Sequence, residues 1–141
     1  MLRSGRVMSL MVFAGFIALA LLASPAVAQP TISARVGDTA TLVAKGAAVD
    51  VAVIYTCSPD AASGAASVDL TQRVSGKRLA RGSGASDAIS CDGTEHTVIL
   101  TEVADDVPFK KGDATAQGSF EVCSLSFECT LIRFSGTVQI R

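Results

Sequence analysis

From residue 31 onward, apolar residues recur at every second position, which is the spacing of a β-strand with one buried face. The clearest run spans residues 49–57, and its apolar set is Val49, Val51, Val53, Tyr55 and Cys57. The same alternation returns at residues 67–74 and 130–140. No stretch after residue 28 carries the i, i+3, i+4, i+7 spacing of an amphipathic helix. The alternation therefore predicts an all-β protein whose strands each turn one face to a common core.

Turn residues divide this part of the chain into short strands. We expect strands at residues 31–36, 39–45, 49–57, 67–74, 77–86, 96–103, 113–123 and 130–140, a loop at 58–66 and an acidic loop at 104–108. Roughly seven to nine such strands in about 100 residues indicate an immunoglobulin-like antiparallel sandwich with Greek-key connections. Lys77, Arg78 and Arg81 are typical of an edge strand that charge protects from mispairing.

Residues 1–28 have the organisation of a cleavable secretory signal peptide. Two arginines within the first six residues precede an apolar run at 7–23. Pro25 stops a helix, and Ala26-Val27-Ala28 places small residues at the two positions that signal peptidase recognises. We therefore expect a signal-peptide helix, cleavage after residue 28 and one mature domain at 29–141. The alternative is an uncleaved anchor, since about 17–25 apolar residues can span a bilayer.

Cleavage would leave a mildly acidic chain. The full sequence has 12 Lys+Arg and 13 Asp+Glu, and losing the two early arginines leaves 12 − 2 = 10 against 13, a net charge of −3. Nucleic-acid binding needs a basic face, so this balance argues against a nucleic-acid partner. A mature chain would also have no stable membrane anchor. We therefore expect a secreted protein, extracellular or associated with the cell wall.

All four cysteines follow the leader: Cys57, Cys91, Cys123 and Cys129. An even number of cysteines in a small exported chain predicts two disulfides. Three pairings are possible, and we favour Cys57–Cys91 with Cys123–Cys129, because the second pair would close a short loop between two strands. The rival is a zinc site of four thiolates, but the spacings lack paired C-x-x-C motifs and export favours oxidation.

Several short motifs resemble a group of small secreted actinobacterial proteins. In chain order they are Tyr55-Thr56-Cys57-Ser58-Pro59, Leu70-Thr71-Gln72-Arg73-Val74, Cys91-Asp92-Gly93 with His96, Phe109-Lys110-Lys111-Gly112-Asp113-Ala114, and Cys123 with Cys129. The resemblance covers about residues 49–129 and implies an immunoglobulin-like sandwich without an assigned activity. More distantly, the chain resembles the neocarzinostatin-type apoproteins, which are secreted sandwiches with two disulfides. Here the first pair would enclose a much longer segment, 58–90, than in that family, and no ligand-contacting residue is carried over. The core Trp that is typical of immunoglobulin domains is also absent, since the chain has no Trp.

The single histidine, His96, ends the sequence D-G-T-E-H with Asp92 and Glu95. Such a cluster could hold a metal or serve acid–base chemistry, but neighbours on a strand point to opposite faces, so His96 and Glu95 would not share a site. A Ser-His-Asp triad would lack the G-x-S-x-G turn that exposes a nucleophile. We therefore expect a protein that is not an enzyme, and we assign no catalytic, cofactor-binding or metal-binding residue.

The five residues between Cys123 and Cys129 form the one segment whose sequence suggests binding. A disulfide would present Leu125 and Phe127 rigidly, and a pre-organised loop binds at lower entropic cost. The plainer alternative is that Phe127 packs on the sheet edge. We expect a non-enzymatic binding domain whose partner is an unknown protein or a small apolar ligand. Two alternatives are a small-molecule carrier with an apolar cleft of about 300–1,000 Å³ and a protease inhibitor that uses residues 124–128.

Overall fold

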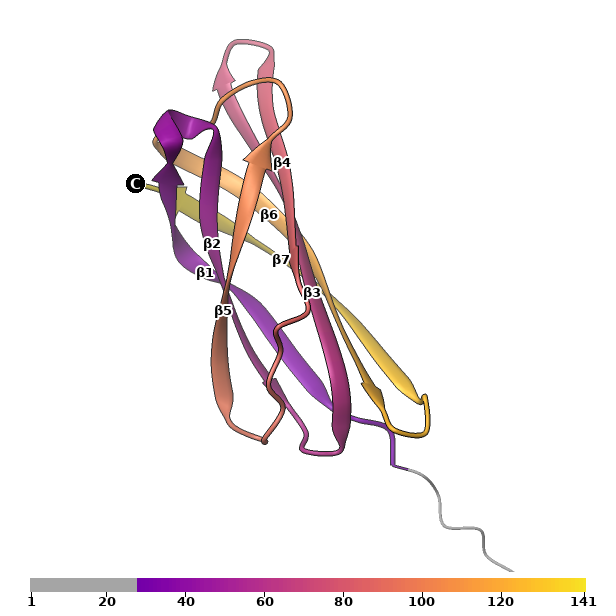
Figure 1. Cartoon of the computed structure of the whole chain (residues 1–141). Helices are drawn as coiled ribbons and strands as arrows, with labels where there is room; N and C mark the ends of the chain where they lie inside the picture. The colour runs from indigo at the N-terminus through magenta and orange to yellow at the C-terminus, as the bar shows by residue number, and fades with distance from the viewer. Residues whose placement is uncertain (1–27) are drawn as a thin grey trace, which may run out of the picture.

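The computed structural model describes residues 28–141, so the expected signal-peptide helix lies outside the described residues. Seven strands follow one another (Figure 1): β1 (Ile32–Val43), β2 (Ala48–Cys57), β3 (Ala61–Ser75), β4 (Arg78–Ser86), β5 (Glu95–Ala104), β6 (Gly112–Ser124) and β7 (Cys129–Ile140). A short 3-10 turn, Ala44–Gly46, joins β1 to β2. Between residues 28 and 141 there is no helix long and apolar enough to cross a membrane.

The strands form one closed barrel in the order β1-β2-β5-β4-β3-β6-β7, and β7 returns to β1. Five joins are long antiparallel ladders, but the other two are narrow. At the first, β4 meets β5 through two residue pairs that include Gly82 and Ser83. At the second, β1 meets β7 in parallel through two pairs that include Thr39 and Ala40. The all-β prediction is confirmed, whereas the expected division into two sheets is not found, because pairing continues across both narrow joins.

Side chains fill the barrel, so it encloses a core and not a channel. The inward set on β2 is the one that the alternation predicts, and all of its members are buried: Val49, Val51, Val53, Tyr55 and Cys57. The other strands add further buried apolar side chains, among them Val68, Leu70, Leu100, Phe120, Val122 and Ile140. The rings of Tyr55 and Phe120 lie 4.8 Å apart at their centroids, which ties β2 to β6 across the interior.

Three segments differ from the boundaries expected from the sequence. The two strands expected at 31–36 and 39–45 are one strand, β1, because the Gly37-Asp38 turn is absorbed as a bulge in the pairing with β2. Two thirds of the loop expected at 58–66 belongs to β3, since its small residues pair with β6 despite their low strand propensity. The segment 77–86 does form β4, and apart from its two pairs with β5 it is paired on one side only.

One end of the barrel is closed by Phe109, which is buried. Its N–H donates to the carbonyl oxygen of Gly46 at 2.9 Å. Gly46 has a φ of 93°, and a Cβ there would collide with the carbonyl oxygen of Phe109, so only glycine fits. The buried Gln72 holds the same segment: its Nε2 donates to the oxygen of Lys110 at 2.7 Å, and the N–H of Lys110 donates to its Oε1 at 2.8 Å.

The opposite end, which we call the disulfide end, carries both disulfides, Cys57–Cys91 and Cys123–Cys129. The predicted pairing is confirmed. The first bridge fastens the segment between β4 and β5 to the end of β2, and the N–H of Ser90 donates to the hydroxyl oxygen of Tyr55 at 3.1 Å. Disulfides persist in oxidising compartments, so both bridges are consistent with an extracellular protein.

Candidate functional site

The β6–β7 hairpin ends in residues 124–128, which we call the clamped loop. Its base is the Cys123–Cys129 disulfide, which joins two residues that pair directly across the ladder. Within the loop, the N–H of Ser124 donates to the oxygen of Glu128 at 2.9 Å, and the N–H of Phe127 donates to the oxygen of Ser124 at 3.0 Å. A covalent bond and two backbone hydrogen bonds therefore fix this turn.

Serine side chains add two hydrogen bonds within the clamped loop. The Oγ of Ser124 lies 2.8 Å from the Oγ of Ser126 and accepts the N–H of Glu128 at 3.3 Å. Serine is favoured in turns because its hydroxyl can bond the local backbone in this way. The apolar side chains of the loop take no part in holding its shape, so they are free to meet a partner.

Those apolar side chains, Leu125 and Phe127, point into solvent. Leu125 is 87% exposed and Phe127 is 89% exposed, the two highest values among the large apolar residues of the described chain. The alternative in which Phe127 packs on the sheet edge is therefore wrong for this structure. Leu131, on the same hairpin, is also exposed. The hairpin thus carries a small apolar surface at the tip of the fold.

The backbone of Phe127 adds a second unusual feature. Its φ is 62°, in the left-handed region, where a side chain other than that of Gly or Asn costs roughly 1–2 kcal/mol. A hairpin turn of this kind favours glycine at such a position. A bulky aromatic residue therefore occupies a position where the backbone conformation is unfavourable. Because its ring is exposed, burial of apolar surface does not offset that strain. Strain of this kind is concentrated at functional sites.

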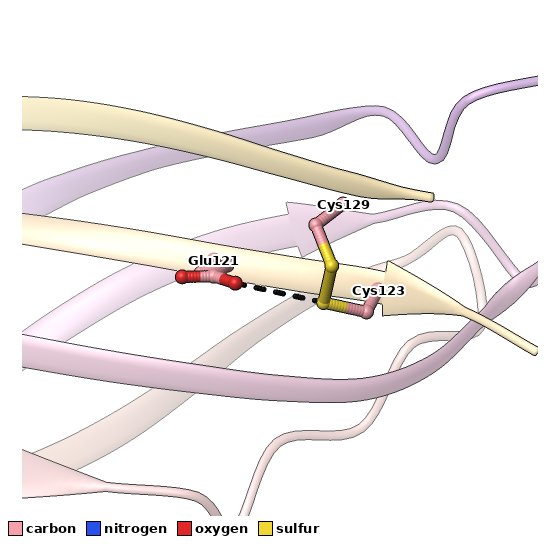
Figure 2. A group of neighbouring side chains, drawn as sticks. All are labelled: Glu121, Cys123 and Cys129. Carbon is pink, nitrogen blue, oxygen red and sulfur yellow. Dashed lines mark hydrogen bonds between the residues drawn. A yellow bond between two sulfur atoms is a disulfide. The ribbon is translucent and has the colours of Figure 1, made fainter. Parts of the chain in front are cut away.

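Glu121 lies beside the clamp, as Figure 2 shows. Its Oε1 is 3.6 Å from the Sγ of Cys123, and with Cys129 the three side chains place three possible metal-ligand atoms within 4.8 Å of one another. The two sulfur atoms are bonded to each other, so they do not offer thiolates. All four cysteines are in disulfides, which also excludes the four-thiolate zinc site in this oxidised form.

His96 belongs to a fixed turn after Cys91. The Oδ1 of Asp92 accepts hydrogen bonds from the N–H of Thr94 at 2.8 Å and from its hydroxyl at 2.7 Å, and it lies 2.8 Å from the Nε2 of His96. The bonds from Thr94, then that from His96, hold the pKa of Asp92 well below its usual range. The ring of His96 stacks on Tyr55 with centroids 5.7 Å apart. These contacts account for His96 as a structural residue.

A hollow of about 390 Å³ lies at the disulfide end beside β1 and β2. Its lining is mostly small or hydroxylated: Thr31, Ile32, Ser33, Thr56, Cys57, Ser58, Pro59 and Gly93. A carrier of an apolar small molecule needs a predominantly hydrophobic cleft with a few polar anchors. Ile32 is the one large aliphatic side chain in this lining, so the hollow does not favour that function.

Glu102, on β5, is a buried acid that the sequence analysis did not single out. It is completely buried, and neither carboxylate oxygen has a hydrogen-bond partner among the described residues. Desolvation, with a smaller effect of the charge on Asp69, raises the pKa of Glu102 to about 8. The carboxyl occupies the space left by Gly84, where a Cβ would lie 3.0 Å from its Oε1. The sequence did contain a signal for this burial, because Glu102 lies two residues after Leu100 and so shares its inward face of the strand.

No protein-family model matches the chain, and no curated protein matches it.

Proposed function

We propose that the chain is a secreted, disulfide-stabilised binding domain without enzymatic activity, which engages a partner through Leu125 and Phe127 of the clamped loop. The observation that carries this proposal is the near-complete exposure of two large apolar side chains on a turn closed by a disulfide. A fixed loop loses little conformational entropy on binding, and aromatic anchors dominate many interfaces.

The strain at Phe127 supports the same function. A left-handed backbone and an exposed ring both lower stability, so folding alone does not explain a phenylalanine there. Glu121 and Glu128 are exposed on the same hairpin, close to the apolar pair in the chain. A partner that suits this surface has an apolar pocket with basic residues at its rim.

The protease-inhibitor alternative fits the loop less well. A protein that binds an extended peptide forms backbone hydrogen bonds with it, so an inhibitor of such a protein needs a strand-like loop. The clamped loop instead turns back on itself, with a hydrogen bond from Phe127 to Ser124 and a left-handed residue at position 127. Failure to slow any member of a panel of serine proteases would remove this alternative. The carrier alternative would be removed if the purified protein contained no apolar ligand and took up none.

For the fold and compartment, we propose a relationship with the secreted immunoglobulin-like proteins. The support is that β1-β2-β5 and β4-β3-β6-β7 are each joined by long ladders, while only two residue pairs link the two groups at each side. The leader-like residues 1–28 and the two disulfides support secretion. Mass spectrometry of protein from the culture medium, with an N-terminus at Gln29, would test it.

The binding function is tested with two matched double variants. L125S/F127S removes the exposed apolar pair of the clamped loop, whereas I99S/V103S removes two other apolar side chains, which are 55% and 60% exposed on β5. Proteins recovered with the wild type from the medium and cell envelope should be lost with the first variant and retained with the second. Equal recovery with wild type and L125S/F127S would overturn the proposal.

A further inference from the structure

The described chain is fastened to the barrel from Pro30 onward. Pro30 is buried, and its carbonyl oxygen accepts the hydroxyl of Thr130 at 2.6 Å. The N–H of Thr31 donates to the Oγ of Ser58 at 2.9 Å, and β1 begins one residue later. Gln29, in contrast, is exposed and forms no hydrogen bond with another described residue. It therefore lies just outside the barrel, next to the first residue that the barrel holds.

The cleavage proposed after residue 28 would make Gln29 the first residue of the mature protein. Its α-amine and its side-chain amide would then belong to one exposed residue, and no hydrogen bond in the described chain restrains either group. An α-amine is partly uncharged near neutral pH, so it can act as a nucleophile. In a glutamine at a chain terminus, this nitrogen reaches the side-chain carbonyl carbon, Cδ, by closing a five-membered ring.

We propose that Gln29 of the mature chain is converted to pyroglutamate. The α-amine nitrogen attacks Cδ of the same residue, and the new N–Cδ bond closes a lactam. The bond between Cδ and Nε2 breaks, and Nε2 leaves as ammonia with a proton from the amine. No oxidant, reductant or second substrate is consumed. The inference rests on the proposed cleavage site and does not depend on the partner of the clamped loop.

The fold favours this ring over a competing one. The amine could instead attack the carbonyl carbon of Pro30, which would release residues 29–30 as a cyclic dipeptide. That carbonyl is held by the hydroxyl of Thr130, and Pro30 is buried. An intramolecular attack requires the reacting atoms to be close together and aligned. The side chain of Gln29 meets this condition by rotating in solvent, whereas attack on Pro30 requires local unfolding first.

The new terminus lies beside the clamp, where the indigo start of the described chain approaches the β6–β7 turn (Figure 1). Thr130, which holds Pro30, directly follows Cys129. Six carboxylates and no Lys or Arg occur in the segments that form the disulfide end, 57–61, 87–95 and 121–131. A free α-amine would place a positive charge among these acids, and the lactam removes it. The surface around the clamped loop then keeps the acidic character that suits a partner with a basic rim.

Peptide mapping of the protein that cells expressing the full chain release into the medium tests the modification. Trypsin should release residues 29–35, because Arg35 is the first Lys or Arg after Gln29. We expect this peptide to be lighter than its unmodified sequence by the mass of one ammonia and to resist sequential chemical degradation from its N-terminus. A synthetic peptide of residues 29–35, carried through the same workup, should remain mainly uncyclised. An equal modified fraction in both peptides would show that the ring forms during handling and would overturn the inference.

Gln29→Asn is the matched control. Asparagine keeps the amide but is one methylene shorter, so the corresponding lactam would be a strained four-membered ring. We expect the N-terminal peptide of this variant to be unmodified, and its mature chain to carry one more positive charge than the wild type. Isoelectric focusing of the folded proteins resolves that difference. A wild-type protein that focuses together with Gln29→Asn would contradict the loss of the amine charge.

The N-terminal peptide also separates this inference from the proposals on which it builds. A wild-type peptide that begins with unmodified Gln29 overturns the modification and leaves secretion and the clamped loop as proposed. A chain that begins at Thr31 shows that the dipeptide is lost instead, which also overturns it. A chain that keeps its leader overturns the proposed cleavage and this inference together. The recovery of partners with L125S/F127S tests the clamped loop independently of all three results.

Discussion

Glu102 makes the free energy of unfolding depend on pH in a window where few other acids titrate. Its carboxyl is fully buried without a hydrogen-bond partner in the described chain, and burial raises its pKa from 4.5 to about 8. Between these values the folded protein binds a proton that the unfolded chain has released. Stability therefore is highest below about pH 4.5 with respect to this group, and it falls as pH rises toward 8.

The size of the effect follows from the shift. Each pKa unit corresponds to about 1.4 kcal/mol, so a shift of 8 − 4.5 = 3.5 units sets an upper bound of about 5 kcal/mol on the loss across the window, and solvent screening lowers it. This is a large part of the roughly 5–15 kcal/mol that stabilises a typical domain. Glu102→Gln has nearly the same shape and cannot ionise. We expect its stability to lack this slope, so that it exceeds the wild-type value by a margin that grows as pH rises from about 4.5 toward 8.

Urea denaturation of wild type and Glu102→Gln from about pH 5 to pH 9 measures the difference directly. Glu95→Gln is the matched control, because Glu95 is exposed on the same strand. Its curve should run parallel to that of the wild type. Parallel curves for wild type and Glu102→Gln would refute the reasoning, because the carboxyl would then have to be solvated or paired in the folded protein.

Three further predictions concern the disulfide end. Phe127→Gly should raise the free energy of unfolding by about 0.5–1 kcal/mol in urea titrations, because glycine relieves the left-handed strain and loses few contacts; a loss of stability would show that the ring packs in solution. Replacing both cysteines of Cys57–Cys91 by alanine should cost about 4 kcal/mol, against about 2.5 for Cys123–Cys129, since the enclosed loops span 34 and 6 residues; equal denaturation midpoints would contradict this. Below pH 3.8 the stability of the wild type should decline as Asp92 is protonated, because its carboxylate contributes stability only while it is ionised. Asp92→Asn should make this decline less steep. An unchanged decline below pH 3.8 in thermal denaturation scans would count against the prediction.

Much of the fold could be predicted because the alternation of apolar and polar residues along a strand indicates which side chains are buried. The inward face of β2 follows from this signal, and the disulfide pairing is favoured because Cys123 and Cys129 close a short loop between two strands. Barrel closure does not follow from the alternation, since it depends on two residue pairs at each narrow join, and these pairs leave no sequence signature. The start of β3 at Ala61 could not be predicted from local sequence either. Its small residues have low strand propensity, and they are in a strand because they pair with β6.

The candidate site divides in the same way. Cysteine spacing located Leu125 and Phe127, but their exposure depends on whether the loop folds back over the sheet, which spacing does not encode. Glu102 lies at an inward position of β5, a strand that the sequence predicted at residues 96–103. Polar residues at such positions are commonly taken as exceptions to the pattern, and only the structure shows that this one is buried without a partner.

The parallel pairing of β1 with β7 has a consequence for the speed and order of folding. Arg141 bonds to Ala40, so the barrel cannot close until nearly the whole chain is available. Contacts this distant in sequence slow folding, because the chain must lose much of its freedom before they form. A chain made from its N-terminus can pair β3 with β4 and oxidise Cys57 and Cys91 early, while β1 keeps an open side. Docking of the β6–β7 hairpin against β1 is then the step that completes the barrel.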